Sequence, residues 1–446
     1  MNKNKNFLSP TSRRKFVKNS SILAGGLLAT PLFSQANYFS GSKDVIKIAL
    51  IGCGGRGTGA TIQALSTKQN VQLVAMADAF RDRVDSSLKA IKNSLDEAGI
   101  DQSKISITED KIFSGFDAYK KAIPLADVVI LTTPPGFRPI HFEEAIKQNK
   151  HVFMEKPVAT DPAGIKKVLE VAEIAKQKKR NVVVGLQRHY QNSYRELFKR
   201  KDLIGDITSA QAWWVGSGVW VKERQPNQTE MEYQMRNWYY FNWLCGDHIV
   251  EQHVHNIDVV NWFKGSYPVK AQGMGGRQVR TDKKYGEIYD HHYVEFHYAD
   301  GSIMNSQCRH IAGTMSKVDE LLVGTKGSIY TGAAVIKDLK GNAIYSYDRK
   351  GENDPYQTEH DELFEAIAKG EYKFADAENG AKSTLTGIIG RMATYSGQVI
   401  DFEKALNSGI DIMPKEYSFN ATPPVVPNED GSYPIAVPGK TRYNLS

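Results

Sequence analysis

The stretch DVIKIALIGCGGRGTGA, residues 44–60, decides the fold of this 446-residue chain. It begins with the apolar run VIKIALI, typical of a buried strand, and continues with glycines spaced Gly52-x-Gly54-x-x-Gly57. Such a glycine pattern alone matches many loops by chance. Here a strand precedes it, a helical segment follows it, and the next strand, VQLVAMAD, ends in Asp78, 21 residues after Gly57. This context predicts a dinucleotide-binding turn.

Each part of the turn has a physical role in binding a pyrophosphate. Gly52 permits the tight turn, Gly54 lets the backbone approach the phosphates, and Gly57 lets the helix pack close to the strand. The N-terminus of that helix presents free N–H groups and a partial positive charge to the phosphates. We therefore predict that the cofactor contacts the whole turn, which consists of Gly52, Cys53, Gly54, Gly55, Arg56 and Gly57.

Asp78, at the tip of the second strand, bears on the choice of cofactor. A carboxylate at this position accepts hydrogen bonds from the adenosine ribose and repels a 2′-phosphate, which favours NAD. Arg81 and Arg83 follow closely and could accommodate a 2′-phosphate, so NADP stays an alternative.

Further alternation of short apolar strands with helices predicts a parallel sheet. ADVVILTTPP at 126–135, HVFMEKP at 151–157 and RNVVVGLQRHY at 180–190 read as strands, and the helical IHFEEAIKQNK separates the first two. Ligands of such sheets bind outside the carboxyl ends of the strands. The residues at these ends are therefore candidates for one crevice: Thr132, Thr133, Pro134, Glu155, Lys156, Gln187, Arg188 and His189.

From about Thr208 the pattern changes to longer strands joined by tight turns, as at Asp300-Gly301. Hairpins without intervening helices predict a mostly antiparallel sheet. We therefore expect an α/β protein with an N-terminal Rossmann domain and a C-terminal α+β domain, whose large open sheet suits a homo-oligomer interface. The predicted boundaries are a leader at 1–36, the NAD(P)-binding domain at 44–165, the substrate and oligomerisation domain at 166–425, and a tail at 426–446.

The first 36 residues have the features of an export signal. TSRRKFVKN precedes the weakly apolar SSILAGGLLATPLF, and Ser34-Gln35-Ala36 supplies a small-x-small cleavage pattern. This order resembles a twin-arginine signal, with Arg13-Arg14 as the pair. The apolar part is too short and too rich in glycine for a stable span. We therefore expect a periplasmic mature chain that the twin-arginine machinery exports and that does not insert in the membrane.

Charge and cysteine content exclude other classes of protein. The leader carries six basic residues and no acid, and the rest of the chain carries 51 basic and 50 acidic residues. A nearly neutral body offers no electrostatic footprint for a nucleic acid. Cys53, Cys245 and Cys308 are too widely separated for a zinc motif or a disulfide framework, so we expect them to be reduced and buried.

The segment LCGDHIVEQHVHNIDVVNW, residues 244–262, holds three histidines in what reads as one hydrophobic helix. His253 falls on its apolar face, and we predict a core histidine there. Within the polar stripe, Glu251 lies one turn before His255 and can orient its imidazole for proton transfer. At about 100° per residue, this stripe consists of His248, Glu251, His255, Asp258 and Trp262.

A metal at this stripe is the alternative interpretation. His248, Glu251 and His255 offer nitrogen and oxygen ligands of the kind that zinc prefers. The helical H-E-x-x-H arrangement is absent, however, and a nicotinamide site needs no metal. We therefore expect no metal, and leave the role of His248 open.

These motifs together resemble the glucose-fructose oxidoreductase, inositol dehydrogenase and MocA (Gfo/Idh/MocA) family. The resemblance covers nearly the whole chain after the leader, and its most specific parts are EKP at 155–157 and EQHVHNID at 251–258. It implies that Lys156 lies beside the nicotinamide and the substrate hydroxyl, and that Glu251 and His255 form the family's acid-x-x-x-His pair. Members usually carry Asp in place of Glu251.

The resemblance implies hydride transfer between NAD and a secondary hydroxyl of a sugar, cyclitol or glycoside. His255 would remove the hydroxyl proton, and Lys156 would polarise the same oxygen. Aromatic side chains suit the apolar faces of a sugar ring, and polar or cationic ones suit its hydroxyls. The candidates for substrate binding are Trp213, Trp238, Tyr239, Gln187, Arg188, His189 and Arg236.

Export leaves three outcomes open, because free NAD is scarce outside the cytoplasm and a tightly bound cofactor must be regenerated in place. A dehydrogenase would use a second substrate to restore NAD, with the ring C3 as one candidate position of oxidation. A redox-neutral glycosidase would oxidise the sugar, eliminate the aglycone and reduce the ketone again. A sugar-binding protein would retain NAD without catalysis.

Overall fold

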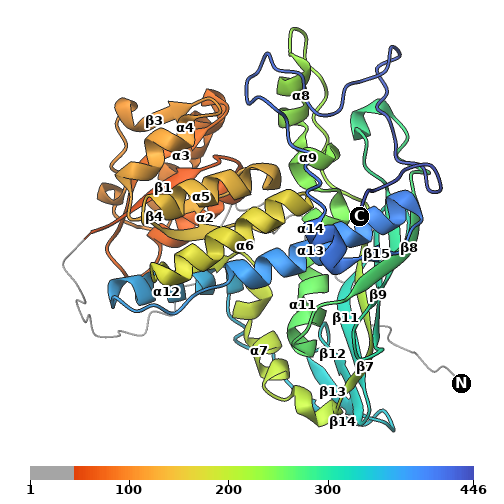
Figure 1. Cartoon of the computed structure of the whole chain (residues 1–446). Coiled ribbons are helices and arrows are strands. Elements are labelled where there is room, and N and C mark those ends of the chain that lie inside the picture. Colours follow the sequence, from red (N-terminus) through yellow and green to blue (C-terminus); the bar gives the residue numbers. More distant parts are fainter. Residues whose placement is uncertain (1–44, 446) are drawn as a thin grey trace, which may run out of the picture. The chain divides into compact units, whose positions relative to one another are not determined.

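The computed structural model describes residues 45–445, so the predicted leader at 1–36 lies outside the described residues. Two sheets organise this part of the chain, the six-stranded sheet A and then the nine-stranded sheet B (Figure 1). Sheet A is parallel throughout, and sheet B is antiparallel except for one pair of strands. The predicted fold class, a Rossmann domain followed by a domain with a mostly antiparallel sheet, is confirmed.

Sheet A has the strand order β3-β2-β1-β4-β5-β6. The chain crosses over between β1 and β4, and ligands of doubly wound sheets bind at such a switch point. The last strand, β6, extends the sheet beyond residue 165, at which we predicted the first domain to end. The strands are β1 Ile46–Ile51, β2 Val71–Asp78, β3 Ile112–Ser114, β4 Val128–Leu131, β5 His151–Met154 and β6 Val182–Val184.

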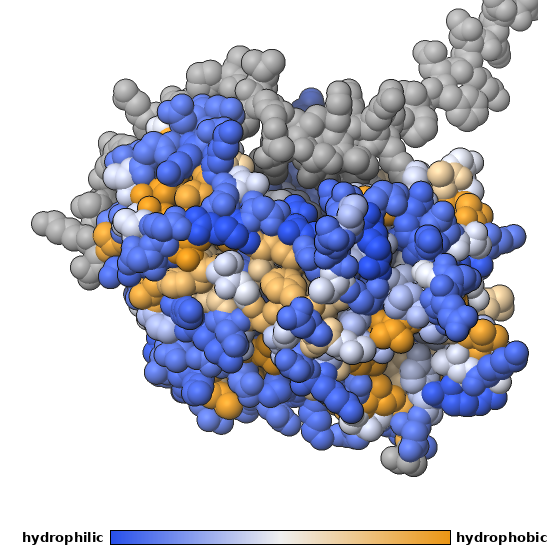
Figure 2. All heavy atoms as spheres, turned by 90° about the horizontal axis from the view of Figure 1, so that it is seen from above, coloured by the Kyte–Doolittle hydropathy of each residue, from blue (hydrophilic) through white to orange (hydrophobic). Residues whose placement is uncertain are grey.

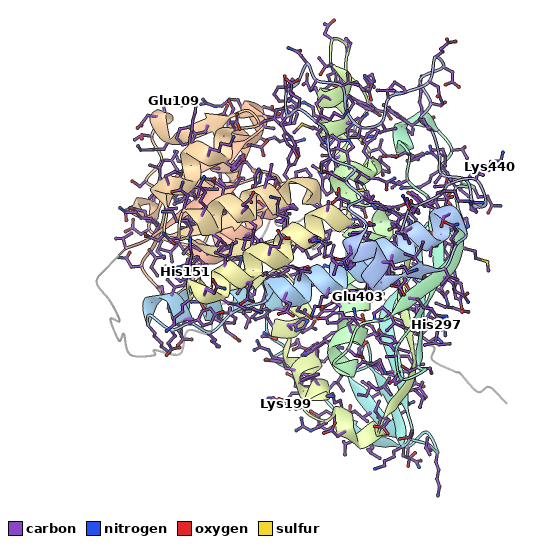
Figure 3. All side chains as sticks on the ribbon, in the orientation of Figure 1. Glu109, His151, Lys199, His297, Glu403 and Lys440 are labelled. Atoms are coloured by element: carbon purple, nitrogen blue, oxygen red, sulfur yellow. The ribbon has the colours of Figure 1, made fainter. Side chains whose placement is uncertain are left out.

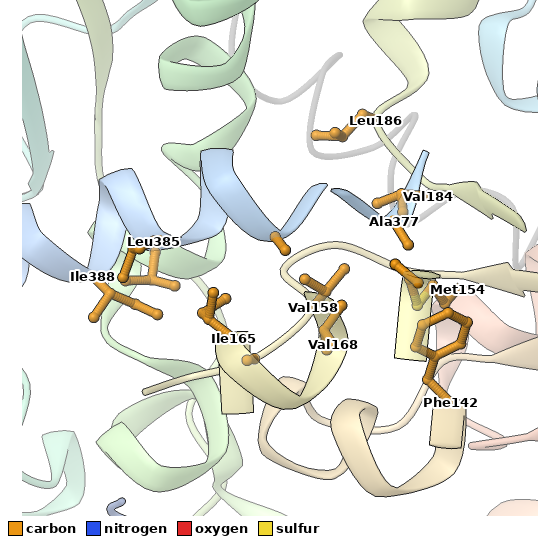
Figure 4. Packing of buried hydrophobic residues seen from close by; sticks show 14 of the residues in the cluster. Phe142, Met154, Val158, Ile165, Val168, Val184, Leu186, Ala377, Leu385 and Ile388 are labelled. Carbon is orange, nitrogen blue, oxygen red and sulfur yellow. The ribbon is translucent and has the colours of Figure 1, made fainter. Parts of the chain in front are cut away.

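Helices cover both faces of sheet A. Helices α2 and α3 pack on one face together with α12, and α5 and α6 pack on the other. Figure 4 shows Phe142 of α5, Ile165 of α6 and Ile388 of α13 in one buried cluster, which also includes Phe296 of sheet B. A continuous apolar core thus joins the two sheets. The helices up to this point in the chain are α2 Gly55–Leu65, α3 Arg81–Glu97, α4 Ala118–Ala122, α5 Arg138–Lys147 and α6 Pro162–Gln177.

Sheet B has the order β14-β13-β12-β11-β7-β10-β9-β8-β15, in which only β7 and β10 pair in parallel. The predicted turn at Asp300-Gly301 joins β9 to β10, and Gly301 adopts a φ of 83°. The strands are β7 Ile207–Gly216, β8 Lys270–Gly276, β9 His291–His297, β10 Ile303–His310, β11 Lys317–Gly324, β12 Gly327–Tyr330, β13 Val335–Asp338, β14 Ala343–Ser346 and β15 Ile400–Asp401.

Helices α11 and α13 lie against sheet B (Figure 1). Residues at alternate positions of β9 and β10 are buried, as expected for a sheet covered on one face. The remaining helices are α7 Asn192–Phe198, α8 Glu230–Arg236, α9 Asn242–Cys245, α10 His248–Glu251, α11 Val254–Lys264, α12 Pro355–Ala368, α13 Ala377–Ser396 and α14 Phe402–Asn407.

The prediction of one helix across residues 244–262 is wrong, because the segment contains three short helices. Gly246 adopts the left-handed conformation, with a φ of 79°, and ends α9. Asp247 also has a positive φ, 70°, and caps the four-residue helix α10. A second interruption follows before α11 begins at Val254.

Two contacts with β10 hold the chain between α10 and α11. His253 Nε2 lies 2.7 Å from the Ser306 hydroxyl, and His310 Nε2 lies 2.8 Å from the Gln252 amide oxygen. His253 is fully buried, as predicted. Because the interruption shifts the helical phase, the side chains of α10 do not continue the polar stripe of α11.

Charged side chains lie at the surface of the protein, and the cysteine thiols are buried. Figure 2 shows one face on which hydrophilic residues predominate and hydrophobic ones occur in small groups. Glu109, Lys199 and Lys440 are exposed and project outward from the ribbon (Figure 3). The cysteines are buried and unpaired, as predicted.

Among the helices of residues 45–445, none is long and apolar enough to cross a bilayer.

Candidate active site

A crevice of about 530 Å³ opens at the carboxyl edge of sheet A. Eight of the predicted cofactor residues line it: Gly52, Gly54, Gly55, Arg56, Asp78, Thr132, Thr133 and Pro134. The sequence analysis did not single out several aromatic side chains that also line it: Phe80, Phe116, Tyr119, Phe137 and Trp220.

The glycine turn leaves space where a cofactor would bind and none where the chain packs on itself. A Cβ at Gly57 would lie 2.0 Å from the Gly52 carbonyl oxygen, and a Cβ at Gly52 would lie 2.4 Å from the Thr133 nitrogen. At Gly54 and Gly55, by contrast, a Cβ would meet no atom within 4 Å. Gly54 precedes the first turn of α2, where backbone N–H groups are free to bind phosphate. The turn therefore fits a dinucleotide pyrophosphate.

Asp78 ends β2 and faces the same crevice. One carboxylate oxygen accepts a hydrogen bond from the Cys53 N–H at 2.7 Å, and the other accepts one from the Phe80 N–H at 2.9 Å. Burial raises the pKa of this carboxyl. The two backbone donors fix its orientation, and each oxygen keeps a lone pair for a ribose hydroxyl.

Two predicted cofactor residues pair with each other. The Arg56 guanidinium forms ion pairs with Glu155 and with the buried Glu359 of α12, at 3.0 Å in the latter case. Its Nη1 also donates to the Gln63 side chain. Glu155 does not line the crevice, so these contacts tie α2 to the end of β5 and to α12.

Arg138, which the sequence analysis missed, connects the ends of two strands. Its side chain is buried and donates to the Thr133 carbonyl at 2.7 Å and to the Glu155 carbonyl at 2.9 Å. Burial lowers the pKa of this guanidinium to about 10, so it stays charged at neutral pH. Next to it, burial lowers the pKa of His141 to about 3, and this ring contacts the Thr133 hydroxyl. In the sequence, the only indication of a role for Arg138 and His141 is that they follow TTPP.

Lys156 and Glu251 meet between the two sheets. The Lys156 ammonium donates to the Glu251 carbonyl at 2.6 Å and to its carboxylate at 3.1 Å. Both side chains are 13% exposed. Sheet A supplies the lysine, at the end of β5, and α10 supplies the acid, so the pair forms only in the folded chain.

His255 lies close to this pair but does not bond to Glu251. Its Nδ1 is buried without a hydrogen-bond partner in the described part of the chain, and its ring stacks on Trp214 at 6.0 Å. Burial first, and the charges of Lys156 and Arg188 second, hold the pKa of His255 well below its ordinary value. The ring is therefore neutral at physiological pH. Glu251, which we expected to orient this imidazole, contacts Lys156 instead.

The predicted substrate residues divide into two groups. Arg236 and Trp238 line the cofactor crevice, and Arg236 also pairs with Asp82 at 3.1 Å. Gln187, Arg188, His189 and Tyr239 do not line it.

Two members of the second group pair with acids, whereas Gln187 Oε1 and the Tyr239 hydroxyl are buried without a hydrogen-bond partner in the described residues. Arg188 forms an ion pair with the buried Glu320, and His189 lies 2.6 Å from the Asp258 carboxylate. The Asp258 carboxylate also accepts hydrogen bonds from Asn379 and Ser383, so residues of α13 hold it together with His189.

The side-chain positions correct the expectation for Trp213 and bear on the alternative metal set. Trp213 faces the Lys317 ammonium at 3.2 Å, whereas its neighbour Trp214 stacks on His255, because adjacent residues of β7 point to opposite faces. The metal set His248, Glu251 and His255 is also not assembled. Of these, His248 stacks on His310 at 4.2 Å, away from the Lys156 pair.

Comparison with known proteins agrees with this arrangement. An oxidoreductase family with an NAD-binding Rossmann fold, Gfo/Idh/MocA, matches residues 46–186, and its C-terminal α/β domain matches residues 218–402. The chain belongs to the Gfo/Idh/MocA family. Membership confirms the predicted NAD-binding domain, which supplies most of the crevice lining, while Arg236 and Trp238 belong to the C-terminal domain.

Several relatives of this Gfo/Idh/MocA protein have been named. Inositol 2-dehydrogenase 3 of Saccharopolyspora erythraea is 26% identical over 288 residues, which cover 61% of this chain and 76% of that one. A glycosyl hydrolase family 109 protein of Solibacter usitatus is 31% identical over 158 residues, 34% of each chain. The match thus spans only about a third of the second relative.

Solved structures share the Gfo/Idh/MocA fold. The aldose-aldose oxidoreductase from Caulobacter crescentus has a TM-score of 0.60 at 18% identity, covering 80% of this chain and 100% of that one. The scyllo-inositol dehydrogenase from Lactobacillus casei with bound NAD(H) and scyllo-inositol has a TM-score of 0.59 at 20% identity, covering 81% and 100%. At such low sequence identities, the similarity is evidence for a shared fold alone.

Two glycine substitutions should separate cofactor binding from folding. Gly54→Val places a side chain in the open space of the turn, so we expect an unchanged thermal midpoint but at least about tenfold weaker NAD binding, or about 1.4 kcal/mol. Gly57→Ala, which inserts only a methyl group, should lower the thermal midpoint because of its contact with the Gly52 carbonyl. Calorimetric titration with NAD and thermal unfolding provide the two readouts. Full NAD affinity in Gly54→Val would contradict the placement of the pyrophosphate.

Proposed function

We propose that this Gfo/Idh/MocA protein transfers a hydride between NAD and a secondary hydroxyl of a sugar, cyclitol or glycoside. Bound NAD would accept or supply the hydride. The names of its relatives support this substrate class, since they include inositol 2-dehydrogenases and an aldose-aldose oxidoreductase. Asp78, with its fixed carboxylate in the crevice, favours NAD over NADP.

The observation that carries this proposal is the buried contact between Lys156 and Glu251 beside the neutral His255. The ammonium group offers a positive charge and donors to a substrate oxygen, and Glu251 keeps that charge stable away from water. The imidazole of His255, which its lowered pKa keeps neutral, can accept the hydroxyl proton. As the proton leaves the hydroxyl, Lys156 would stabilise the negative charge that develops on the oxygen, while the hydride would leave from the carbon that bears this oxygen.

A second candidate function is a redox-neutral glycosidase. It is favoured by the similarity to the glycosyl hydrolase family 109 protein. In that reaction transient oxidation, for example at C3, would acidify the neighbouring C–H, the aglycone would leave by elimination, water would add to the resulting double bond, and the ketone would be reduced back. The same lysine and histidine would serve its first step, so only the products distinguish the two functions.

Product analysis with variants tests both functions. Incubation with sugars and glycosides should give a keto-sugar and reduced NAD if the protein is a dehydrogenase, and free monosaccharide without net oxidation if it is a glycosidase. Lys156→Met and His255→Asn should each lower kcat/KM by about 10²- to 10⁴-fold. Lys167→Met, at a partly exposed lysine of α6 that pairs with Glu143, is the matched control. Full activity of the double variant would contradict both functions and leave a sugar-binding protein that retains NAD.

The pH profile tests the role of His255. A base must be deprotonated, and the pKa of His255 is lowered from 6.5, so its active form persists to lower pH. We expect kcat/KM to stay nearly constant between about pH 8 and 6, whereas a histidine of ordinary pKa would leave about a quarter of the activity at pH 6. A fall centred near pH 6.5 or above would argue against His255 as the base.

We further propose export of the folded, cofactor-loaded chain to the periplasm, based on the Arg13-Arg14 pair and the short apolar segment after it. A homo-oligomer is proposed on the basis of the open sheet B. Lysine substitution of both arginines should retain the protein in the cytoplasm, as measured by cell fractionation. Unchanged periplasmic recovery of the double variant would exclude the twin-arginine route.

A further inference from the structure

Three side chains that the proposed reaction does not use meet between α10 and sheet B. Asp247 is the N-cap of α10, His248 is its first residue, and His292 lies on β9. All three side chains are 0% exposed. One nitrogen or carboxylate oxygen from each lies within 4.8 Å of the others.

The hydrogen bonds around His292 determine which of its nitrogens carries a lone pair. Its Nδ1 lies 2.9 Å from the Thr394 hydroxyl, and that hydroxyl donates its own hydrogen to the Arg391 carbonyl at 2.9 Å. Thr394 must therefore accept from Nδ1–H, so the lone pair of the neutral ring is on Nε2. This Nε2 lies 3.2 Å from Asp247 Oδ2 in a geometry that makes no hydrogen bond. With the neutral ring, two electron-rich atoms therefore lie side by side.

His248 is the second unexplained group. Neither of its ring nitrogens has a hydrogen-bond partner within residues 45–445, although the ring is fully buried. Leaving such a buried group unpaired is destabilising. Its Nε2 lies 3.8 Å from Asp247 Oδ1, so it points toward the same carboxylate as His292.

We propose that Asp247, His248 and His292 bind a divalent transition-metal ion, and that zinc fits them best. Two imidazoles and one carboxylate are typical zinc ligands, whereas calcium and magnesium prefer oxygen ligands alone. Zinc bonds of about 2.0–2.1 Å place the ligand atoms of a tetrahedral centre about 3.3 Å apart. His292 Nε2 lies 3.2 Å from Asp247 Oδ2 and His248 Nε2 lies 3.8 Å from Asp247 Oδ1, so each ring nitrogen is near this distance from one oxygen of the carboxylate, and one ligand atom from each residue lies within 4.8 Å of the others. Three protein ligands leave a fourth position for water or another oxygen.

Neighbouring residues form hydrogen bonds with the proposed ligands, as residues around the ligands of known metal sites do. The Tyr395 hydroxyl donates to Asp247 Oδ2 at 2.6 Å, and the Tyr289 N–H donates to the same oxygen at 3.0 Å. Together with Thr394 behind His292, these donors orient the ligands and fix the histidine tautomer. The ion would link α10 to β9 one helical turn before Glu251. This inference concerns the ion alone and does not depend on the proposed reaction.

Metal analysis of untagged, full-length protein tests the site. We expect about one zinc ion per chain by mass spectrometry, and at least a tenfold loss in His248→Gln and in His292→Gln. His360→Gln is the matched control, since His360 of α12 is equally buried, also lacks hydrogen-bond partners in the described region, and belongs to no such cluster there. It should keep the zinc.

Cobalt substitution provides a readout that needs no variant. Co²⁺ bound to the wild-type chain should show the intense visible absorption of a tetrahedral site with nitrogen ligands. A wild-type protein that retains no stoichiometric ion after dialysis against zinc would overturn the proposal. So would a cobalt spectrum like that of the hydrated ion, or equal zinc content in folded His248→Gln and His292→Gln.

Discussion

The close approach of the glycine turn to the end of β4 is the constraint on which the rest of the site depends. The space between the Gly52 carbonyl and α2 has no room for a Cβ at Gly57, and Gly52 lies against the backbone of Thr132 and Thr133. Only with this contact does the N-terminus of α2 point into the crevice. Asp78, oriented by the N–H of Cys53 within the turn, depends on the same backbone path.

Sheet A could be predicted from the sequence because its signals are local. The apolar run of β2 coincides with the predicted strand, and Asp78 is its last residue. Parallel strands that are buried on both faces read as continuous apolar segments, and the glycines mark the turn between them. Eight of the predicted cofactor residues line the crevice for the same reason, since the carboxyl ends of such strands meet at one edge.

The part of the active site that α10 and α11 supply could not be predicted in this way. Its geometry depends on contacts with residues that are far away in the sequence. The interruption between these helices follows from contacts of Gln252 and His253 with residues of β10 more than 50 positions later. A helical projection of 244–262 therefore gave a continuous stripe that the chain does not have. The partner of Glu251, Lys156, is 95 residues away and belongs to the other sheet.

The burial of the Lys156 charge explains why the end of β5 and α10 must come together. Lys156 is mostly shielded from water, and an unpaired ammonium in such a place is costly, so the Glu251 carboxylate and carbonyl stabilise it. At His255, burial is the main cause that lowers the pKa and disfavours the imidazolium, and the positive charges of Lys156 and Arg188 add to this effect. The lysine thus has two effects: it offers a charge to an oxygen that becomes negative, and it keeps the neighbouring ring in its proton-accepting form. Removal of Glu251 would leave the lysine unpaired and would alter both effects together, although Glu251 does not bond to His255.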